Sequence, residues 1–229
     1  VTQAAGATIT SPNLIIDTQA AITLNEANVV DIFAAQSTIS GDIAYTDVDD
    51  IIIGSNTILA NTEFERNVIA TSGAVSITSN GGKITVVNGG VVNEIGATTG
   101  ITLQTAANNF LFVSTGADIL ATGGTIEIRA DDLLMAINAD SGQITNAGRT
   151  VLLRSAADNE AINLGSTTLD TTDNILKISA AELGVITAGQ LTLGHANAGA
   201  ITVSRDINPS ATTLELITAS TVDADTASG

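Results

Sequence analysis

Residues 101–128 read ITLQTAANNFLFVSTGADILATGGTIEI, and this stretch contains the pattern that decides the fold. It begins with the apolar–polar–apolar triplet 101–103, continues through 110–112 and Ile119, and reaches a second triplet of the first kind at 126–128. Alternation with a period of two residues, rich in β-branched side chains, is typical of a strand that is buried on one face. The stretch therefore predicts three short strands before the pattern starts again.

Three interleaved series of apolar positions extend this pattern along the chain. Most neighbouring members lie about 25 residues apart, although two gaps in the second series are somewhat longer. Such a nearly fixed period is the signature of a solenoid repeat. The first series has triplets starting at Val75, Ile101, Ile126, Val151, Leu176 and Ile201, with Ile51 upstream; the second has triplets starting at Phe110, Leu134, Ile162, Ile186 and Leu214; the third contains Ile119, Ile144, Leu169, Leu193 and Ile217.

The repeat predicts an all-β fold, a right-handed parallel β-helix (β-solenoid) with three short strands in each turn, or rung, of about 25 residues. Each strand would pair in parallel with the equivalent strand one rung later. A chain of 229 residues would form about nine rungs, and a rod roughly 43 Å long at about 4.8 Å per rung. We expect one domain over residues 1–229, in which residues 1–72 are less regular.

The composition agrees with a thin aliphatic interior. Hydrophobic residues make up 44 % of the chain but aromatic residues only 2 %, and the mean hydropathy of +0.36 excludes intrinsic disorder. The net charge of −17 leaves no basic patch, so nucleic acid and anionic membrane surfaces are excluded as partners. There is no cysteine and no apolar run long enough to insert into a membrane. The start at Val1 suggests a mature product or a piece of a longer chain.

Polar residues recur at one expected corner of the rungs, at nearly the same interval as the apolar triplets. Amides and carboxylates at a tight corner favour turn chemistry, and we prefer this interpretation to a cation site. The residues are Asn108, Asp132, Asp158, Glu182 and Asn208.

Some β-helical proteins cleave polysaccharides, and such a site would need paired acids close to a histidine and a basic residue. The candidates are Asp131–Asp132, Gly194–His195 and Arg205. The acids precede His195 by more than two rungs, so the groups would lie about 10 to 15 Å apart along the rod. We therefore expect no enzyme, interpret His195 as a solvated turn residue, and assign no catalytic or cofactor-binding residue.

Two further functions, Ca²⁺ binding and ice binding, would each need a particular array of surface side chains. The acidic turns at Asp47–Asp50 and Asp170–Asp173 could bind Ca²⁺, although a solvated acidic turn is the preferred interpretation of both. Ice binding would need a flat rank of threonines, but charged and bulky residues interrupt the expected outward rank. That rank is Ser76, Thr102, Glu127, Leu152, Lys177 and Thr202.

The segments TTLDTTDNILKI (167–178), ITAGQLTLG (186–194) and AGAITVS (198–204) resemble the repeats of filamentous-haemagglutinin-type exoproteins and related bacterial adhesins. The match is clearest over residues 167–220, and a looser pattern runs from about residue 73 to the end. The resemblance implies a right-handed parallel β-helix, export across a Gram-negative envelope and an adhesive role. It implies no catalytic residues.

Three functions follow as hypotheses. The first is a non-enzymatic extracellular module, the rigid shaft of a secreted bacterial adhesin or surface fibre, whose partner is a ligand on a host or neighbouring cell. The second is a subunit that stacks end to end on copies of itself, for which residues 7–10 (ATIT) would supply a strand without a partner. The third is a polysaccharide-active enzyme.

Overall fold

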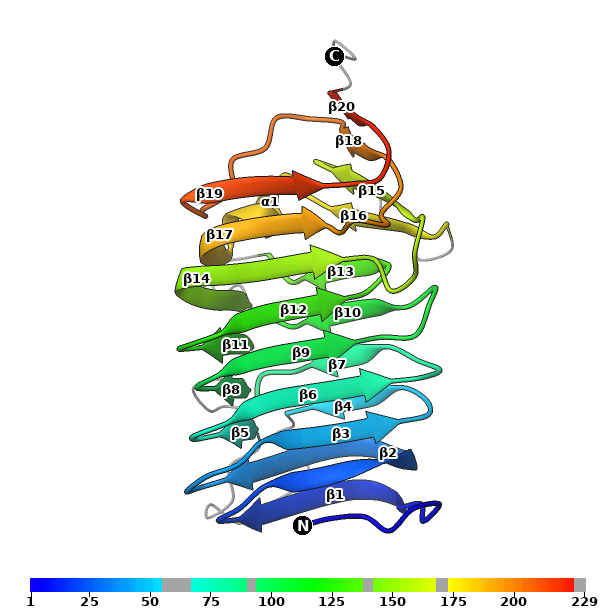
Figure 1. Ribbon diagram of the computed structural model, residues 1–229, viewed down its shortest axis with the longest axis vertical. Helices are drawn as coiled ribbons and strands as arrows, with labels where there is room; N and C mark the ends of the chain where they lie inside the picture. The colour runs from blue at the N-terminus through cyan, green and yellow to red at the C-terminus, as the bar shows by residue number, and fades with distance from the viewer. Residues whose placement is uncertain (55–66, 90–93, 138–141, 168–172, 225–229) are drawn as a thin grey trace.

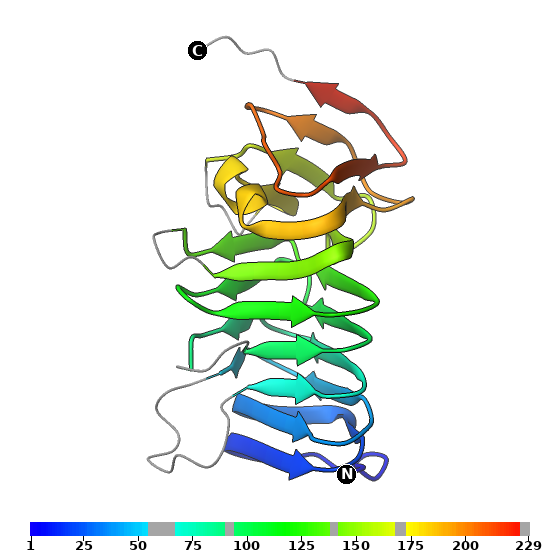
Figure 2. The same ribbon diagram turned by 90° about the vertical axis from the view of Figure 1, so that its left-hand side faces the viewer.

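The computed structural model describes residues 1–54, 67–89, 94–137, 142–167 and 173–224. It is all-β, with 56 % strand and 3 % helix, and its twenty strands form one long, parallel-paired sheet compatible with a β-solenoid. The chain climbs from the N-terminus at one end to the C-terminus at the other (Figure 1). A view turned by 90° shows the same stacking of strands from one end to the other (Figure 2).

The elements follow one another as short strands with a single short helix among the described residues. They are β1 (Thr10–Thr18), β2 (Ile22–Ser37), β3 (Ile43–Asp47), β4 (Ile51–Ile53), β5 (Val68–Ala70), β6 (Ala74–Ser79), β7 (Ile84–Val86), β8 (Ile95–Ala97), β9 (Gly100–Gln104), β10 (Phe110–Val113), β11 (Asp118–Ala121), β12 (Thr125–Arg129), β13 (Asp132–Met135), β14 (Gln143–Arg154), β15 (Ala161–Leu164), β16 (Ile175–Ile178), α1 (Ala180–Gly184), β17 (Ile186–Gly194), β18 (Ile201–Val203), β19 (Thr213–Ile217) and β20 (Val222–Ala224).

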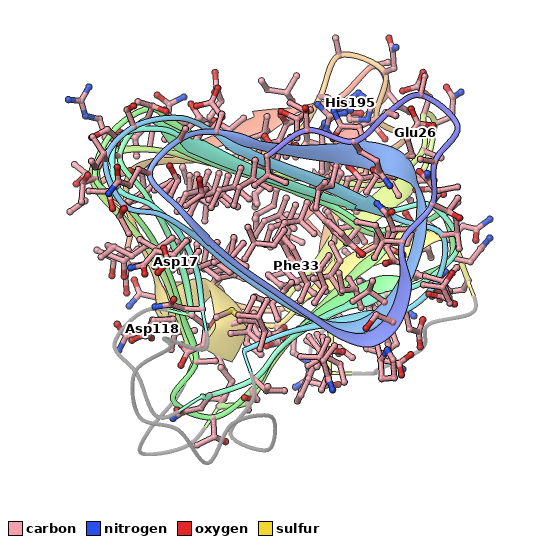
Figure 3. All side chains as sticks on the ribbon, turned by 90° about the horizontal axis from the view of Figure 1, so that it is seen from below. Asp17, Glu26, Phe33, Asp118 and His195 are labelled. Carbon is pink, nitrogen blue, oxygen red and sulfur yellow. The ribbon has the colours of Figure 1, made fainter. Side chains whose placement is uncertain are left out.

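The strands form three columns, which enclose the interior in a view along the long axis (Figure 3). The first column contains the start of β2, then β3, β6, β9, β12, the end of β14, the end of β17, and β19. Its buried residues stack in register, and the predicted pairing of the triplets at 75, 101, 126 and 151 is confirmed. The buried stack is Ile22, Ile43, Val75, Ile101, Ile126, Val151 and Leu191, and the register continues to the exposed Leu214.

The second column runs β1, the later part of β2, β4, β7, β10, β13, β16, β15, β18 and β20. The third contains the end of β2, then β5, β8, β11 and the starts of β14 and β17. The predicted alignment of Ile119 with Ile144 is confirmed. The predicted alignment of the triplets starting at Phe110 and Leu134 is wrong by two residues, because Phe110 pairs with Asp132 and Phe112 with Leu134.

The predicted series are wrong after Val151. Its partner in the next rung is Leu191, well beyond one repeat length, because β15, β16 and α1 occupy the intervening chain. Residues assigned to one series therefore lie in another column. Leu176 and Ile201 of the first series both pair with Ile162 in the second column; Ile186 pairs with Ile144 in the third; Leu193 and Leu214 lie in the first; upstream, Ile51 pairs with Ile84 in the second. Leu169 lies outside the described residues.

Strand order is interchanged in this region. β15 precedes β16 in the sequence, yet β16 lies between β13 and β15 in the second column. β15 then pairs with β18 on its other side. A single register pair, Asp132 with Lys177, joins β13 to β16. The ladder of the second column is consequently thinnest at this point.

The interior is mostly Ile, Leu, Val and Ala, many of them with no exposed surface. Among the described residues, the two fully buried rings lie near the N-terminal end, where Phe33 and Tyr45 stack with centroids 4.0 Å apart. In the axial view Phe33 lies inside the coil, while Asp17 and Glu26 lie at its rim (Figure 3). In the same region the successive register positions Ile22, Ile43 and Val75 are unevenly spaced in the sequence.

Residues 7–10 were predicted to supply a strand without a partner. Instead, β1 begins at Thr10 and pairs with β2 along one of its edges. The carbonyl of Ile9 accepts a hydrogen bond from the Val29 amide at 2.9 Å, and Thr10 pairs in register with Val29. Since backbone groups alternate in direction along a strand, this bond places Pro12 with its nitrogen toward the open edge. Proline has no N–H to donate there, which weakens that edge as a template for another strand.

Candidate functional site

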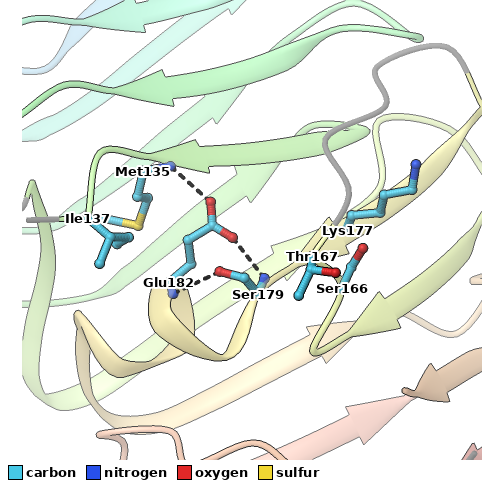
Figure 4. A pocket seen from close by; sticks show the side chains of 7 residues that line it. All are labelled: Met135, Ile137, Ser166, Thr167, Lys177, Ser179 and Glu182. Carbon is cyan, nitrogen blue, oxygen red and sulfur yellow. Dashed lines mark hydrogen bonds between the residues drawn. The ribbon is translucent and has the colours of Figure 1, made fainter. Parts of the chain in front are cut away.

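A small cavity of about 220 Å³ lies where the end of β13, β16 and α1 meet (Figure 4). It is the place where the interchanged strands leave the regular stacking. Its polar side chains all come from residues 166–182, and its two apolar ones come from the end of β13 and the residues that follow it. The lining residues are Met135, Ile137, Ser166, Thr167, Lys177, Ser179 and Glu182.

Glu182 uses both carboxylate oxygens to anchor the helix. Oε1 accepts from the Met135 amide at 3.0 Å and Oε2 from the Ser179 amide at 2.8 Å. The Ser179 hydroxyl accepts from the Glu182 amide at 3.2 Å, which completes a capping box. Burial raises the pKa of Glu182, and these hydrogen bonds oppose the shift. The arrangement makes Glu182 a structural clamp between α1 and β13.

Asp132 and Lys177 form the charged side of the same region. The Asp132 Oδ1 atom accepts from the Lys177 amide at 3.3 Å, and the Lys177 ammonium lies 2.5 Å from Asp173 Oδ2. Burial raises the pKa of Asp132 to about 7, while Lys177 lowers it and the charges of Glu182 and Asp173 raise it. Asp132 Oδ2 is buried and makes no hydrogen bond. Chemically, this carboxyl can hold or release a proton near neutral pH.

Asp131 serves a different cluster from its neighbour. Its Oδ2 atom accepts from the Asn108 amide in the rung below, and Oδ1 accepts from the Ala156 amide in the rung above at 2.9 Å. The pKa of Glu160 is raised to about 8. Burial is the largest cause of this shift, and the hydrogen bond and charge of the neighbouring Asp131 add to it. The predicted pair Asp131–Asp132 is therefore split between two environments. The carboxyl that interacts with Asp131 is that of Glu160 instead.

A Glu160→Gln variant tests this carboxyl pair. Folded Glu160 holds its proton up to about pH 8, whereas the unfolded chain loses it near 4.5, so wild-type stability falls as pH rises through that window. The amide of Gln cannot ionise. We expect the two proteins to have similar free energies of unfolding at pH 5, and the variant to be the more stable at pH 9, in urea titrations. Parallel pH profiles would contradict the raised pKa of Glu160.

His195 is not the solvated turn residue that was predicted, because its side chain is only 15 % exposed. Nδ1 accepts from the Asn197 amide at 3.3 Å and lies 3.9 Å from Asp158 Oδ1. Burial lowers the pKa of His195, and the charge of Arg154 lowers it further. Asp131 lies between β12 and β13, and His195 directly follows β17. Both residues are therefore at the corner that follows the first column, and two levels of that column separate them.

Arg205 is not brought to this corner. It follows β18 and packs beside Gly165, where an added β-carbon would lie 2.9 Å from the Arg205 β-carbon. Asp131 instead precedes β13, at the opposite end of the parallel strands of the second column. Arg205 and Asp131, which were weighed as members of one site, are therefore not brought together.

The acidic turn at 47–50 is used internally. Asp47 is fully buried, which contradicts the solvated-turn interpretation for this residue; its Oδ2 accepts from the Tyr45 hydroxyl at 2.5 Å and from the Val30 amide at 3.1 Å. Burial and the neighbouring Asp47 raise the pKa of Tyr45. Asp50 forms a 3.0 Å ion pair with Lys83. Asp170 lies outside the described residues. Among the described residues, no group of three potential metal-ligating side chains occurs.

The predicted polar corner is only partly a set of turns. Asn108 has a φ of 60°, as a tight corner requires, but Asp132 lies in β13 and Glu182 in α1. A different set of buried polar side chains closes the corner after the first column. Its signal in the sequence was a polar residue at or shortly after the end of each first-column segment, and sequence reasoning missed it. The set is Asn28, Asp47, Ser79, Thr105 and Ser155.

The outward rank of the first column also differs from the prediction. Ser76, Thr102, Glu127 and Leu152 stack in register as expected, but the next members are Thr192 and Glu215. Lys177 and Thr202 belong to the second column. Within the rank, Glu127 Oε1 accepts from Arg129 Nε at 2.8 Å and from Arg154 Nε at 2.7 Å. The two guanidiniums lower the pKa of Glu127 against the effect of its burial.

No family model, curated protein or solved structure matches this chain. Of the helical segments that the structure describes, none has the length and apolar character needed to cross a membrane.

Proposed function

We propose that the chain is a non-enzymatic extracellular module, the rigid shaft of a secreted bacterial adhesin or surface fibre. In this proposal the coil is right-handed and has about nine rungs. One observation carries it: parallel pairing links β1 to β20 around a continuous aliphatic core. Each rung then supports its neighbours, as in other quasi-one-dimensional folds.

The use of the polar clusters supports a structural role. Glu182, Asp131 and Asp47 each accept hydrogen bonds from backbone amides on both carboxylate oxygens. Carboxylates engaged in this way fix turns and a helix end. Catalytic acids need instead an oxygen directed at a substrate.

Negative-stain electron microscopy of the purified chain, with and without millimolar Ca²⁺, tests this function. We expect separate straight rods roughly 43 Å long in both conditions. Compact globules would overturn the shaft. A change in shape on adding Ca²⁺ would reveal a cation site that the shaft proposal does not include.

End-to-end assembly is the second candidate, and the exposed end of the core favours it. Leu191 and Ile201 have no exposed surface, whereas their register partners one level higher, Leu214 and Val222, are 37 % and 49 % exposed. A second copy could cover them. Pro12 opposes this at the other end, so we expect filaments, if any, to become more abundant in a Pro12→Val variant. Filaments with a repeat near the rod length would favour this candidate over the separate shaft.

A further inference from the structure

A shallow groove of about 570 Å³ crosses four levels of the first column, over the strands β12, β14, β17 and β19. These four strands lie one above another in Figure 1. Its wall is a row of polar side chains in register: Thr125, Thr150, Gln190 and Thr213. Four levels span about 14 Å along the rod. The groove is lined only by Gly, Thr, Gln and Arg, so it offers hydroxyls, an amide and a guanidinium but no large apolar side chain.

A bulge places the one charged side chain of the groove. Between the register pairs Asn146–Ala188 and Thr150–Gln190, β14 has three residues where β17 has one. The extra residues end in Gly148, with φ of 71°, and the exposed Arg149. Asn146 closes the bulge, since its side-chain amide donates to the Thr150 carbonyl at 2.8 Å. Bulges commonly redirect a side chain next to a functional site.

Arg149 also differs from most other cations of the described chain. Lys83, Arg129, Arg154 and Lys177 all form ion pairs. Within the described ranges, the Arg149 guanidinium forms no ion pair and no hydrogen bond. Gln190, by contrast, is held in place by a 2.6 Å hydrogen bond to Glu215. The groove therefore combines a row of polar side chains, of which Gln190 is held by Glu215, with an exposed cation that has no protein partner among the described residues.

We propose that this groove binds a short oligosaccharide that carries one carboxylate. The row of hydroxyls suits a polyhydroxylated ligand, and the rung spacing of about 4.8 Å is close to the length of one sugar ring. The guanidinium suits a carboxylate, which it can bind through two parallel hydrogen bonds. The net charge of −17 opposes a polyanion, so a single acidic group fits better than a highly charged polymer. A passive shaft needs no such ligand, and the inference therefore goes beyond the proposed function.

Calorimetric titration with two probes tests the groove: a neutral β-linked glucose trisaccharide, and the same trisaccharide with one terminal glucuronic acid. We expect wild-type protein to bind the acidic probe more tightly than the neutral one. An Arg149→Gln variant should lose about tenfold in affinity for the acidic probe, since a charge-assisted pair is lost. Its affinity for the neutral probe should not change.

Arg205→Gln is the matched control, because Arg205 also forms no ion pair among the described residues and lies outside the groove. Binding by this variant should equal that of wild type. The groove is overturned if wild type fails to bind the acidic probe at millimolar concentration, if Arg149→Gln binds it as tightly, or if Arg205→Gln loses as much affinity. Rods in electron micrographs without sugar binding would overturn the groove and leave the shaft intact.

Discussion

An Ile126→Ala variant is expected to lose about 3 kcal/mol of unfolding free energy, within the range of about 2 to 5 kcal/mol for emptying a buried isoleucine site. Ile126 has no exposed surface and stacks between Ile101 and Val151, which are also buried. In a narrow coil the neighbours above and below are held by their own ladders, so they cannot collapse into the space. Urea denaturation followed by circular dichroism measures the loss.

Thr102→Ala is the control for this prediction. Thr102 lies on the outward side of β9, next to Ile101, and pairs in register with Glu127. Removing a partly exposed side chain usually changes stability by less than about 0.5 kcal/mol. If Ile126→Ala cost no more than this control, the stacked aliphatic interior would not be the source of stability.

A Gly124→Ala variant is expected to lose about 3 to 4 kcal/mol, from the cost of a left-handed backbone together with a steric overlap. Gly124 has φ of 64°, and an added β-carbon would overlap the carbonyl oxygen of Thr99 in the rung below. Relief would require the two rungs to separate at this corner. Close stacking of the two rungs at this corner therefore requires glycine, which has no β-carbon.

Gly148→Ala separates the two contributions. Gly148 has a similar φ of 71°, but an added β-carbon would meet nothing within 4 Å. We expect this variant to lose only about 1 kcal/mol, the cost of the left-handed backbone. Thermal unfolding of both variants, compared with wild type, gives the measurement. Equal losses would show that the contact with Thr99 does not limit rung spacing.

The sequence predicts the fold well where one repeat follows another without insertion. Val75, Ile101, Ile126 and Val151 could be aligned because their spacing reports the true length of one rung there. Beyond Val151 the same spacing leads to Leu176, which lies in another column. An apolar triplet carries no mark of the column to which it belongs. Periodicity alone therefore cannot detect an insertion that contains strands of its own.

The polar clusters were harder to predict than the strands. Asp131 and Asp132 are adjacent in the sequence, but the backbone directs one toward Glu160 and the other toward Lys177. These partners come from separate, later segments of the chain, and the second belongs to the interchanged region. Arg149 could not be recognised either, because its placement depends on a bulge that is defined only by the pairing of β14 with β17.

The interchanged order of β15 and β16 has a consequence for how the chain folds as it emerges. A regular coil can grow from its N-terminus, since each completed turn is a template for the next. At β15 this growth must pause, because the strand that lies beneath it, β16, comes later in the chain. Residues 161–164 can pair on their lower side only after residues 175–178 have been placed. β18 then pairs with the upper side of β15. The interchange therefore makes the second column depend on a later segment of the chain at this level, whereas every level below it is built from strands in chain order.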